Sequence, residues 1–336
     1  HALLPDDAVV MCSFGDASAN HSTAQGAFNT AQWTSYQSVP LPLLFVCEDN
    51  GIGISTKTPK GWIEATFSQR PGLKYFKADG LDLYDTYRVA ADAAAYVRTR
   101  RKPAFLHLAT IRLYGHAGAD MPTTYLPREE VEAEEAQDPL LHSVRLLDLA
   151  GVMTPDQALA VYRDTCARVE RVAADAIQRP RLQTAKQVMA SLIPPPRPNR
   201  PTNGPTPEAR AQAFGSDLKA MDDPQPMSRL LNWALTDLML THRELVMMGE
   251  DVGRKGGVYG VTQKLHARFG ADRMIDTLLD EQSILGLAIG MAQNGFVPLP
   301  EIQFLAYLHN AEDQLRGEAA TLPFFSQGQF TNPMVL

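Results

Sequence analysis

Three polar side chains come shortly after apolar, strand-like runs, and each is of a type that binds cations or moves protons. They are Asp16 after "AVVMCSF" (8–14), Asn50 after "LLFVCED" (43–49) and His116 after "AFLHLAT" (104–110). Magnesium prefers carboxylate, amide and carbonyl oxygens in combination with phosphate oxygens. We therefore expect Asp16 to hold a divalent metal ion, and that ion to hold a diphosphate group.

Asn50 is the expected second ligand of this ion. If the two runs are neighbouring parallel strands, their carboxyl ends meet at one edge of a sheet, where ligands bind in such folds. Gly51 and Gly53 would let the backbone approach the ion and expose a carbonyl, that of Ile52. Gly-Asp and Asn-Gly are also ordinary turn pairs, so the alternative is a turn without a ligand.

The elements that must position these residues follow an alternating pattern. The three apolar runs are separated by helical patterns near 20–37 and 82–100. Continuous apolar strands that alternate with helices are typical of a mostly parallel sheet covered by helices on both faces. The predicted fold class is therefore α/β.

The second half of the sequence repeats this organisation after a change in composition. Residues 154–178 predict a helix that begins with a capping box, and the stretch 193–209 is too rich in proline to sustain a helix or strand pairing. Another strand (244–251) and helix (283–293) follow. We expect two α/β domains of the same type, with boundaries at 1–184 and 226–336 and a Pro-rich linker at 185–225.

Composition excludes several classes of protein. The formal net charge of −7 and the isoelectric point near 5.6 argue against a nucleic-acid surface. No apolar run approaches the roughly 18 residues that span a bilayer, and the first residues lack the layout of a signal peptide. We expect a cytoplasmic protein, with Cys12, Cys47 and Cys166 as reduced core residues. Both ends of the sequence read as those of a fragment.

Three collinear stretches resemble one known family and together cover most of the chain outside the linker. "GDASANHSTAQGAFNTA" with "LPLLFVCEDNGIGIST" resembles the thiamine diphosphate fold signature, and "IRLYGHAGADMPTTYLPREEVE" resembles the histidine loop of the α subunit of 2-oxo acid dehydrogenases. "GEDVGRKGGVYGVT", "DRMIDTLLDEQSILGLAIG" and "EIQFLAYLHNAEDQ" resemble the β subunit. The resemblance implies a single-chain fusion of α and β parts, with two domains of the thiamine diphosphate-binding type.

The resemblance also implies roles for individual residues. Asp16 and Asn50 match magnesium ligands through their side chains, and Ile52 matches one through its backbone carbonyl. Ala17 and Ser18 match positions near the diphosphate. Those that match the catalytic and cofactor-binding positions are Glu281 at the aminopyrimidine ring, His116 in the loop that serves transfer to lipoamide, and Gln303 and Tyr307 on the β face. A carboxylate at the pyrimidine nitrogen favours the ring form that takes up the thiazolium proton.

The sequence departs from the family pattern at a few positions. Ala17 replaces a usual glycine, Asp49 stands where many relatives have an asparagine, and Ala117 replaces the serine that mitochondrial relatives phosphorylate. The resemblance implies that the family's α segment before the Gly-Asp pair and the carboxyl-terminal domain of its β subunit are missing from this sequence, and that some cofactor and substrate contacts lie in those segments.

The implied activity is oxidative decarboxylation of a 2-oxo acid, with transfer of the acyl group to the lipoyl domain of a partner acyltransferase. A branched-chain substrate such as 2-oxoisovalerate is the first expectation because Tyr307 follows "EIQF", and pyruvate is next; acetoin-cleaving relatives share similar features. The resemblance favours a homodimer of fused chains. The alternatives are a non-oxidative enzyme of the transketolase type and a catalytically silent scaffold or assembly module.

Overall fold

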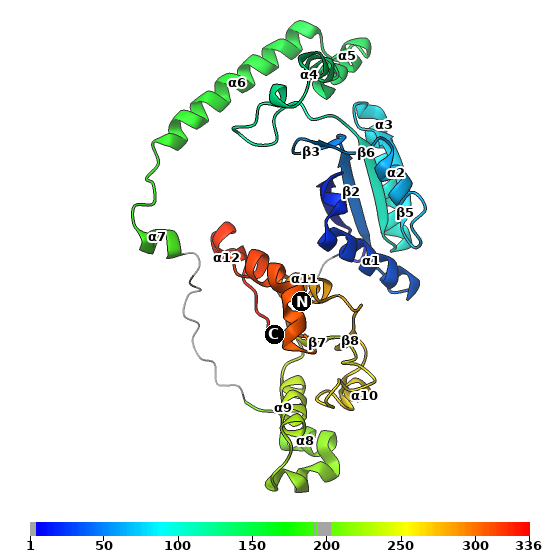
Figure 1. Cartoon of the computed structure of the whole chain (residues 1–336), viewed down its shortest axis with the longest axis vertical. Helices are drawn as coiled ribbons and strands as arrows, with labels where there is room; N and C mark the ends of the chain where they lie inside the picture. Colours follow the sequence, from blue (N-terminus) through cyan, green and yellow to red (C-terminus); the bar gives the residue numbers. More distant parts are fainter. Residues whose placement is uncertain (1–4, 191–192, 194–202) are drawn as a thin grey trace. The chain divides into compact units, whose positions relative to one another are not determined.

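The structure is a computed structural model that describes residues 5–190, 193 and 203–336 (Figure 1). The chain divides into two compact units, one that ends at Arg181 and one that runs from Leu182 to Leu336. Each unit contains its own sheet, and each is described by itself below.

The first unit is built on a parallel sheet with the strand order β1-β2-β6-β5. Its strands are β1 (Val10–Gly15), β2 (Leu43–Asp49), β5 (Lys74–Asp79) and β6 (Ala104–Ala109). A short antiparallel hairpin of β3 (Ile52–Gly53) and β4 (Thr56–Lys57) follows β2. The expected strands at 8–14, 43–49 and 104–110 are thus present, whereas β5 was not predicted.

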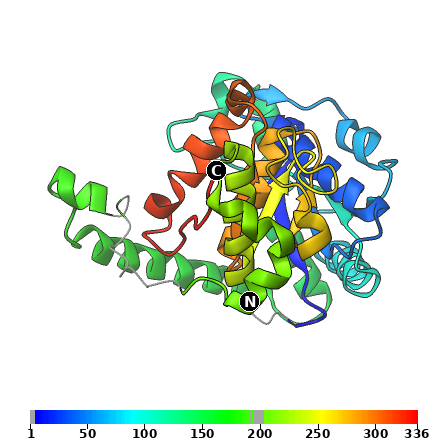
Figure 2. The ribbon, with the colours of Figure 1, turned by 90° about the horizontal axis from the view of Figure 1, so that it is seen from below.

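Helices cover both faces of this sheet (Figures 1 and 2). The helices that pack on it are α1 (Ser22–Tyr36), α2 (Trp62–Phe67) and α3 (Leu83–Arg100). Phe28 of α1 and Phe67 of α2 join Phe45 and Phe105 in an aromatic core on one face. Residues of α3, with Val97 fully buried, pack on the other face. Burial on both faces explains the continuous apolar runs of β2 and β6, whereas most of β1, at the edge of the sheet, is exposed.

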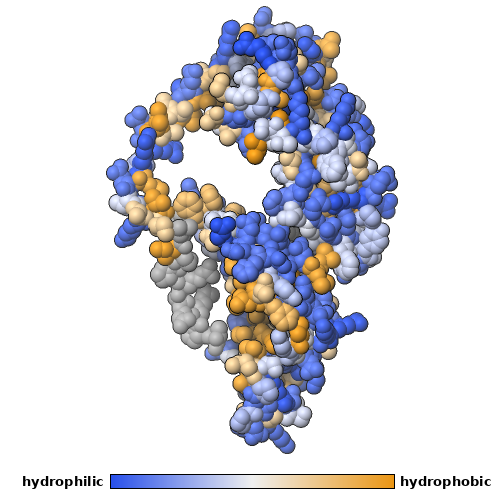
Figure 3. All heavy atoms as spheres, viewed as in Figure 1, coloured by the Kyte–Doolittle hydropathy of each residue, from blue (hydrophilic) through white to orange (hydrophobic). Residues whose placement is uncertain are grey.

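The rest of the first unit is helical and more exposed. It contains η1 (Ser18–Asn20), η2 (Pro122–Thr124), α4 (Arg128–Glu135), α5 (Pro139–Leu149) and α6 (Pro155–Ile177). The predicted capping box at the start of α6 is present, because Thr154 and Gln157 satisfy each other's backbone N–H groups. No residue of α6 is buried, and Figure 3 shows apolar and polar side chains side by side along it.

The stretch expected as a linker contains helices. They are α7 (Ala185–Met189), α8 (Pro207–Phe214) and the 3₁₀ helix η4 (Gly215–Asp222). The expectation that 193–209 holds no helix is wrong at its end, because Pro207 stands at the first turn of α8, where its missing N–H is not needed. Residues 191–192 and 194–202 of this stretch lie outside the described residues.

The second unit has a smaller parallel sheet with the order β8-β7-β9. Its elements are β7 (Leu245–Gly249), β8 (Met274–Asp276), β9 (Val297–Glu301), α9 (Met227–Thr241), α10 (Leu265–Phe269), α11 (Glu281–Gln293), η5 (Leu305–Ala311), the π-helical segment η6 (Gln314–Ala319) and α12 (Leu322–Phe325). Met239 of α9 and Leu265 of α10 pack on one face of β7, and Ala288 of α11 packs on the other.

Both units are therefore mostly parallel sheets with helices on both sides, as the sequence predicted. One expectation about the core is wrong: Cys47 is buried, but Cys12 and Cys166 are exposed. Cys12 lies on β1, which is the edge strand of its sheet, and Cys166 lies on α6, which buries no residue. Among the described residues, no helix is both long and apolar enough to cross a membrane.

Candidate functional site

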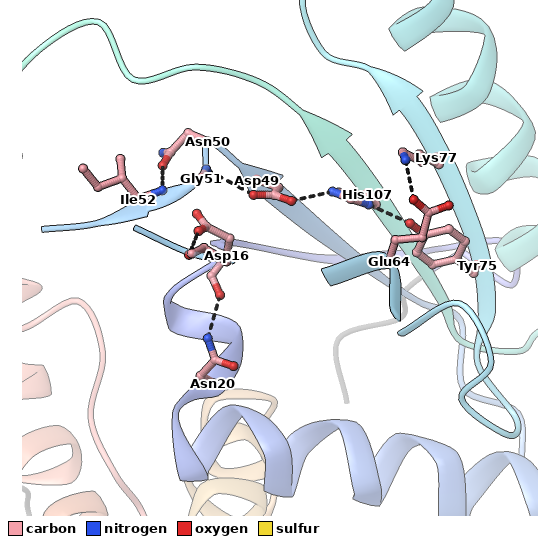
Figure 4. A network of polar contacts seen from close by, with 11 residues as sticks. Asp16, Asn20, Asp49, Asn50, Gly51, Ile52, Glu64, Tyr75, Lys77 and His107 are labelled. Carbon is pink, nitrogen blue, oxygen red and sulfur yellow. Dashed lines mark hydrogen bonds and ion pairs between the residues drawn. The ribbon is translucent and has the colours of Figure 1, made fainter. Parts of the chain in front are cut away.

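Asp16 and Asn50 lie at the same edge of the first sheet. Strands β1 and β2 are parallel neighbours whose register pairs Phe14 with Cys47 and Gly15 with Glu48. Asp16 and Asn50 come just after the ends of these strands, so the chain brings the two side chains to adjacent tips. Figure 4 shows both of them with Ile52 and Asp49 at this edge. The predicted neighbourhood of the two strands is confirmed.

Asp16 is a buried carboxylate, with only 1% of its surface exposed. The Thr58 hydroxyl donates a hydrogen bond to Asp16 Oδ2, and Asn20 Nδ2 donates to the Asp16 backbone carbonyl at 3.3 Å. In the described part of the chain, no basic side chain forms an ion pair with Asp16. Since a buried charge is costly unless it is paired or binds a metal, Asp16 is suited to a cation.

The turn after β2 carries the other two predicted ligands. Ile52 N–H donates to Asn50 Oδ1 at 3.2 Å, and Gly51 N–H donates to Asp49 Oδ1 at 3.1 Å. Gly51 has a φ of 76°, in the left-handed region that favours glycine. Local side-chain bonds of this kind fix a turn, so Asn50 and Ile52 have defined orientations.

Gly53 lies directly against Ala17, the residue after Asp16. A Cβ built on Gly53 would lie 2.3 Å from the Ala17 Cβ, which no real contact allows. A cavity of about 320 Å³ opens beside this contact and is lined by Ala17, Asn20, Gly53, Thr56, Lys57, Thr58, Pro59 and Trp62. Ala17 and Ser18 are exposed, with Ser18 the first residue of η1. The absence of a side chain at Gly53 thus lets the hairpin pack against Ala17, and the approach of this backbone to an ion stays a prediction.

These residues fit a magnesium ion that binds a diphosphate. Asp16 could supply one carboxylate, Asn50 an amide oxygen and Ile52 a carbonyl, which are types of oxygen ligand that magnesium takes together with phosphate. Within the described residues there is no cluster of three or more His, Cys, Asp or Glu side chains that could hold a metal. The proposed ligand set needs only one such side chain.

Sequence reasoning missed a buried polar chain behind this turn. His107 on β6 is 3% exposed; its Nε2 lies 2.9 Å from Asp49 Oδ2, and its Nδ1 lies 2.6 Å from the Tyr75 hydroxyl. The hydrogen bond from His107 lowers the pKa of Asp49, and burial raises the pKa of Tyr75. A histidine inside an otherwise apolar strand was the signal that could have revealed the chain.

His116 is exposed and lies in the loop after β6. Its backbone N–H donates to Asp120 Oδ2 at 2.7 Å, and the Tyr125 hydroxyl donates to the same oxygen at 2.8 Å. Arg112 Nη2 in turn donates to the Tyr125 hydroxyl at 2.7 Å. The hydrogen bond from the His116 amide lowers the pKa of Asp120. The backbone of this loop is thus held, while the imidazole faces solvent.

The remaining predicted residues belong to the second unit. Glu281 is the first residue of α11, and Asn310 Nδ2 donates to its Oε2 at 3.3 Å. Gln303 Nε2 donates to the Glu250 carbonyl at 3.1 Å. Tyr307 is exposed, and its ring centroid lies 5.4 Å from that of Phe304. The structure thus places Gln303 and Tyr307 in the segment after β9.

Two further carboxylates of the second unit were not predicted. Burial and the charge of Glu281 raise the pKa of Glu250, which follows β7. Burial, with the charges of Asp251 and Glu250, raises the pKa of Glu301 at the end of β9. Glu301 Oε2 is buried and has no hydrogen-bond partner among the described residues. Three acidic side chains, those of Glu250, Asp251 and Glu301, therefore lie near the carboxyl ends of β7 and β9.

Comparison with known proteins gives two family matches along the chain. The model of the "Dehydrogenase E1 component" family matches residues 3–185, more than half of the chain. The model of the "Transketolase, pyrimidine binding domain" family matches residues 223–322.

Curated relatives match a shorter part of the chain. The 3-methyl-2-oxobutanoate dehydrogenase subunit beta of Mycobacterium tuberculosis is 41% identical over 110 residues, which are 33% of this chain and 32% of the relative. The pyruvate dehydrogenase E1 component subunit beta of Bacillus subtilis is 39% identical over 107 residues, 31% of this chain and 33% of the relative. That of Staphylococcus aureus is 40% identical over 110 residues, 33% of this chain and 34% of the relative.

The chain thus spans about a third of the length of the curated relatives it matches. The match to the dehydrogenase family covers the unit that carries Asp16, Asn50 and His116. The other match covers Glu281, Gln303 and Tyr307. On the extent of the first match, the chain belongs to the dehydrogenase E1 component family.

Proposed function

We propose that this protein is a thiamine diphosphate-dependent 2-oxo acid dehydrogenase that decarboxylates its substrate oxidatively. The observation that carries the proposal is the buried Asp16 carboxylate, without a basic partner in the described residues, beside the Asn50–Ile52 turn. When bound, thiamine diphosphate supplies the carbon nucleophile for the 2-oxo group, and Mg²⁺ neutralises its diphosphate. The chain belongs to the dehydrogenase E1 component family. The motifs around Asp16 resemble those that bind thiamine diphosphate, which also supports this chemistry.

The residues of the first unit bind and orient in this proposal. Asp16, Asn50 and the Ile52 carbonyl would hold Mg²⁺, and Ala17 and Ser18 would lie near the diphosphate. The close contact between Gly53 and Ala17 leaves no space for a side chain there, so the backbone itself forms the wall of the site. Preformed oxygen ligands reduce the free energy lost in ordering the turn when the ion binds.

The residues of the second unit act on the cofactor ring. Glu281 would hold a proton at the pyrimidine nitrogen, because an ionised carboxylate favours the protonated ring, and Gln303 and Tyr307 would line the β face of the active site. Glu281 begins α11, and its interaction with Asn310 restricts the side chain. We further propose that His116 serves the proton movements of acyl transfer to the lipoyl domain of a partner acyltransferase.

The wider assignments are also proposals. The substrate is a 2-oxo acid, with a branched-chain acid favoured and pyruvate next; relatives that carry either substrate in their names support this class. Two family matches on separate stretches support a fusion of α-like and β-like parts. We also propose two domains at 1–184 and 226–336, joined by a Pro-rich linker at 185–225. The proposed assembly is a homodimer of fused chains, and the proposed location is cytoplasmic.

A non-oxidative reaction of the transketolase type is the second candidate, since the match over residues 223–322 carries that description. The dehydrogenase family match over the first unit favours the oxidative reaction.

The test is carbon dioxide release from a panel of 2-oxo acids, with an artificial electron acceptor, thiamine diphosphate and Mg²⁺. Release that requires the acceptor and disappears in Asp16→Ala supports the proposal. Release that instead depends on a sugar acceptor favours the transketolase type. No release from any acid, despite tight cofactor binding, favours a silent scaffold and contradicts the proposed activity.

A further inference from the structure

We propose that Tyr75, His107 and Asp49 form a buried positioning chain that holds the metal-binding turn in shape. The inference rests on the proposed function, because it assigns the turn a metal. It concerns three side chains that no proposed ligand or catalytic role includes. None of the three is proposed to touch the ion; they act on it through the backbone of the turn.

The hydrogen-bonded chain of Tyr75, His107 and Asp49 crosses three adjacent strands of the first sheet (Figure 4). His107 lies on β6, which runs between β2 and β5, and its register partners are Cys47 on one side and Lys77 on the other. Asp49 at the end of β2 and Tyr75 on β5 contact the two ring nitrogens of His107. Since the strands are fixed by their ladders, the imidazole has little freedom to leave this position.

The chemistry of the groups sets the direction of the hydrogen bonds. An ionised carboxylate only accepts, so His107 Nε2–H donates to Asp49 Oδ2. In the neutral imidazole the other nitrogen is then an acceptor, and the Tyr75 hydroxyl donates to Nδ1. The contacts of 2.9 Å and 2.6 Å are both within normal hydrogen-bond distance.

The far end of the chain is the metal-binding turn. Asp49 Oδ1 accepts the Gly51 N–H at 3.1 Å, so the two oxygens of one carboxylate link His107 to the turn. Gly51 has a positive φ and stands between Asn50 and Ile52, the two proposed ligands of the turn. A rotation of the Asp49 side chain would therefore release the residue on which both ligands depend. Partners behind metal ligands typically change metal affinity by about 10- to 100-fold when they are removed.

The test compares His107→Ala and Asp49→Ala with the conservative Asp49→Asn. An asparagine keeps an oxygen for the Gly51 amide, and its amide group can donate to His107, which then donates to Tyr75 in reversed order. We expect the two alanine variants to weaken Mg²⁺ binding about 10- to 100-fold, as measured by calorimetry at saturating thiamine diphosphate, and Asp49→Asn to stay within about threefold. Tyr75→Phe should fall between them.

A core variant separates positioning from general stability. Val97→Ala removes fully buried atoms of α3, in a core cluster that includes neither residues of the turn nor the three side chains of the positioning chain. It should lower the melting temperature and leave Mg²⁺ affinity unchanged. If Val97→Ala weakens Mg²⁺ binding as much as His107→Ala does at a similar loss in melting temperature, the positioning role is wrong.

Amide hydrogen exchange of the cofactor-free chain tests the inference apart from the proposed function. His107→Ala should speed exchange at Gly51 about tenfold or more, because the charged Asp49 carboxylate that accepts the Gly51 N–H is then released. Unchanged exchange at Gly51 overturns the inference whether or not the protein binds cofactor. If the wild-type chain binds no thiamine diphosphate with Mg²⁺, the proposed function fails and the exchange result alone decides the positioning role.

Discussion

Gly53 faces Ala17 at a distance that leaves no room for a side chain, since an added Cβ would lie 2.3 Å from the Ala17 Cβ. The contact joins the hairpin after β2 to the residue that follows Asp16. It fixes how closely the two halves of the proposed metal site approach each other.

Replacement of Gly53 by alanine should therefore move the hairpin away from Ala17. We expect a loss of about 1 to 3 kcal/mol in unfolding free energy, as for overpacked sites, and weaker binding of thiamine diphosphate with Mg²⁺. Chemical denaturation and calorimetry measure the two effects. Ser55→Ala, in the exposed turn of the same hairpin, is the control and should change neither. Wild-type stability and affinity in Gly53→Ala would show that the contact is loose in solution.

Glu301 should make the second unit more stable at acidic than at neutral pH. Burial and the nearby Asp251 and Glu250 raise the pKa of Glu301 above its ordinary value of 4.5, so the folded state keeps this proton to a higher pH than the unfolded state does. Its contribution to stability is therefore present below 4.5 and is lost as the pH rises through the folded-state pKa.

Glu301→Gln should accordingly raise the melting temperature at about pH 8 and have a smaller effect at about pH 4, where the wild-type carboxyl is protonated. Scanning calorimetry of the cofactor-free protein at both values tests this. Glu244→Gln is a contrasting variant, because hydrogen bonding, first of all to its own backbone amide, lowers the pKa of Glu244, and the substitution should lower the melting temperature at neutral pH. A Glu301→Gln effect that does not change with pH would contradict the assignment.

His116→Ala should reduce acyl transfer to a lipoyl domain more than it reduces turnover with a dye acceptor. The imidazole is exposed, while the backbone of its loop is held by Asp120, so the substitution should leave the loop in place. Parallel assays with the two acceptors give the ratio of the losses. His142→Ala on α5 serves as the matched control. Equal losses with both acceptors would argue for a role of His116 in binding.

Glu281→Gln should slow cofactor activation while most of the affinity for the cofactor remains. The amide keeps the shape of the carboxylate but cannot stabilise a protonated pyrimidine nitrogen in the same way. A hydrogen bond to a charged group is worth about 1.5 to 3 kcal/mol, which corresponds to a rate loss of about 10- to 150-fold. Hydrogen–deuterium exchange at the thiazolium carbon of bound cofactor measures this rate. Wild-type exchange in Glu281→Gln, as expected for the exposed control Glu312→Gln, would leave Glu281 as a helix-start carboxylate only.

Local signals account for the parts of the fold that the sequence predicted. The strand at 43–49 has the same bounds in the structure, because an uninterrupted apolar run marks a strand buried on both faces. The start of α6 was predicted from its capping box, which needs only neighbouring residues. Strand β5 was missed because its lysines break the apolar run. Strand β9 was missed because Pro298 and Pro300 argue against a strand, although β9 is an edge of the described sheet, where proline is tolerated.

The candidate site was likewise predictable only where a local or topological rule applies. The meeting of Asp16 and Asn50 follows from a rule about the ends of parallel strands. The contact between His107 and Asp49 could not be predicted, because it depends on β6 being the other neighbour of β2 and on their register. The burial of Glu301 likewise depends on how β7 and β9 pair.

The role of Asp16 as a magnesium ligand is the central claim, and titration calorimetry of thiamine diphosphate tests it most directly. The wild-type chain should bind the cofactor in Mg²⁺ and lose most of that affinity in a chelator. Asp16→Ala should abolish the Mg²⁺-dependent part, because the diphosphate then lacks its cation, and Asp16→Asn should weaken it while the fold is retained. Asp92→Asn on the exposed side of α3 is the control and should bind as the wild type does. Unchanged, Mg²⁺-dependent affinity in Asp16→Ala would contradict the account and remove Asp16 from the site.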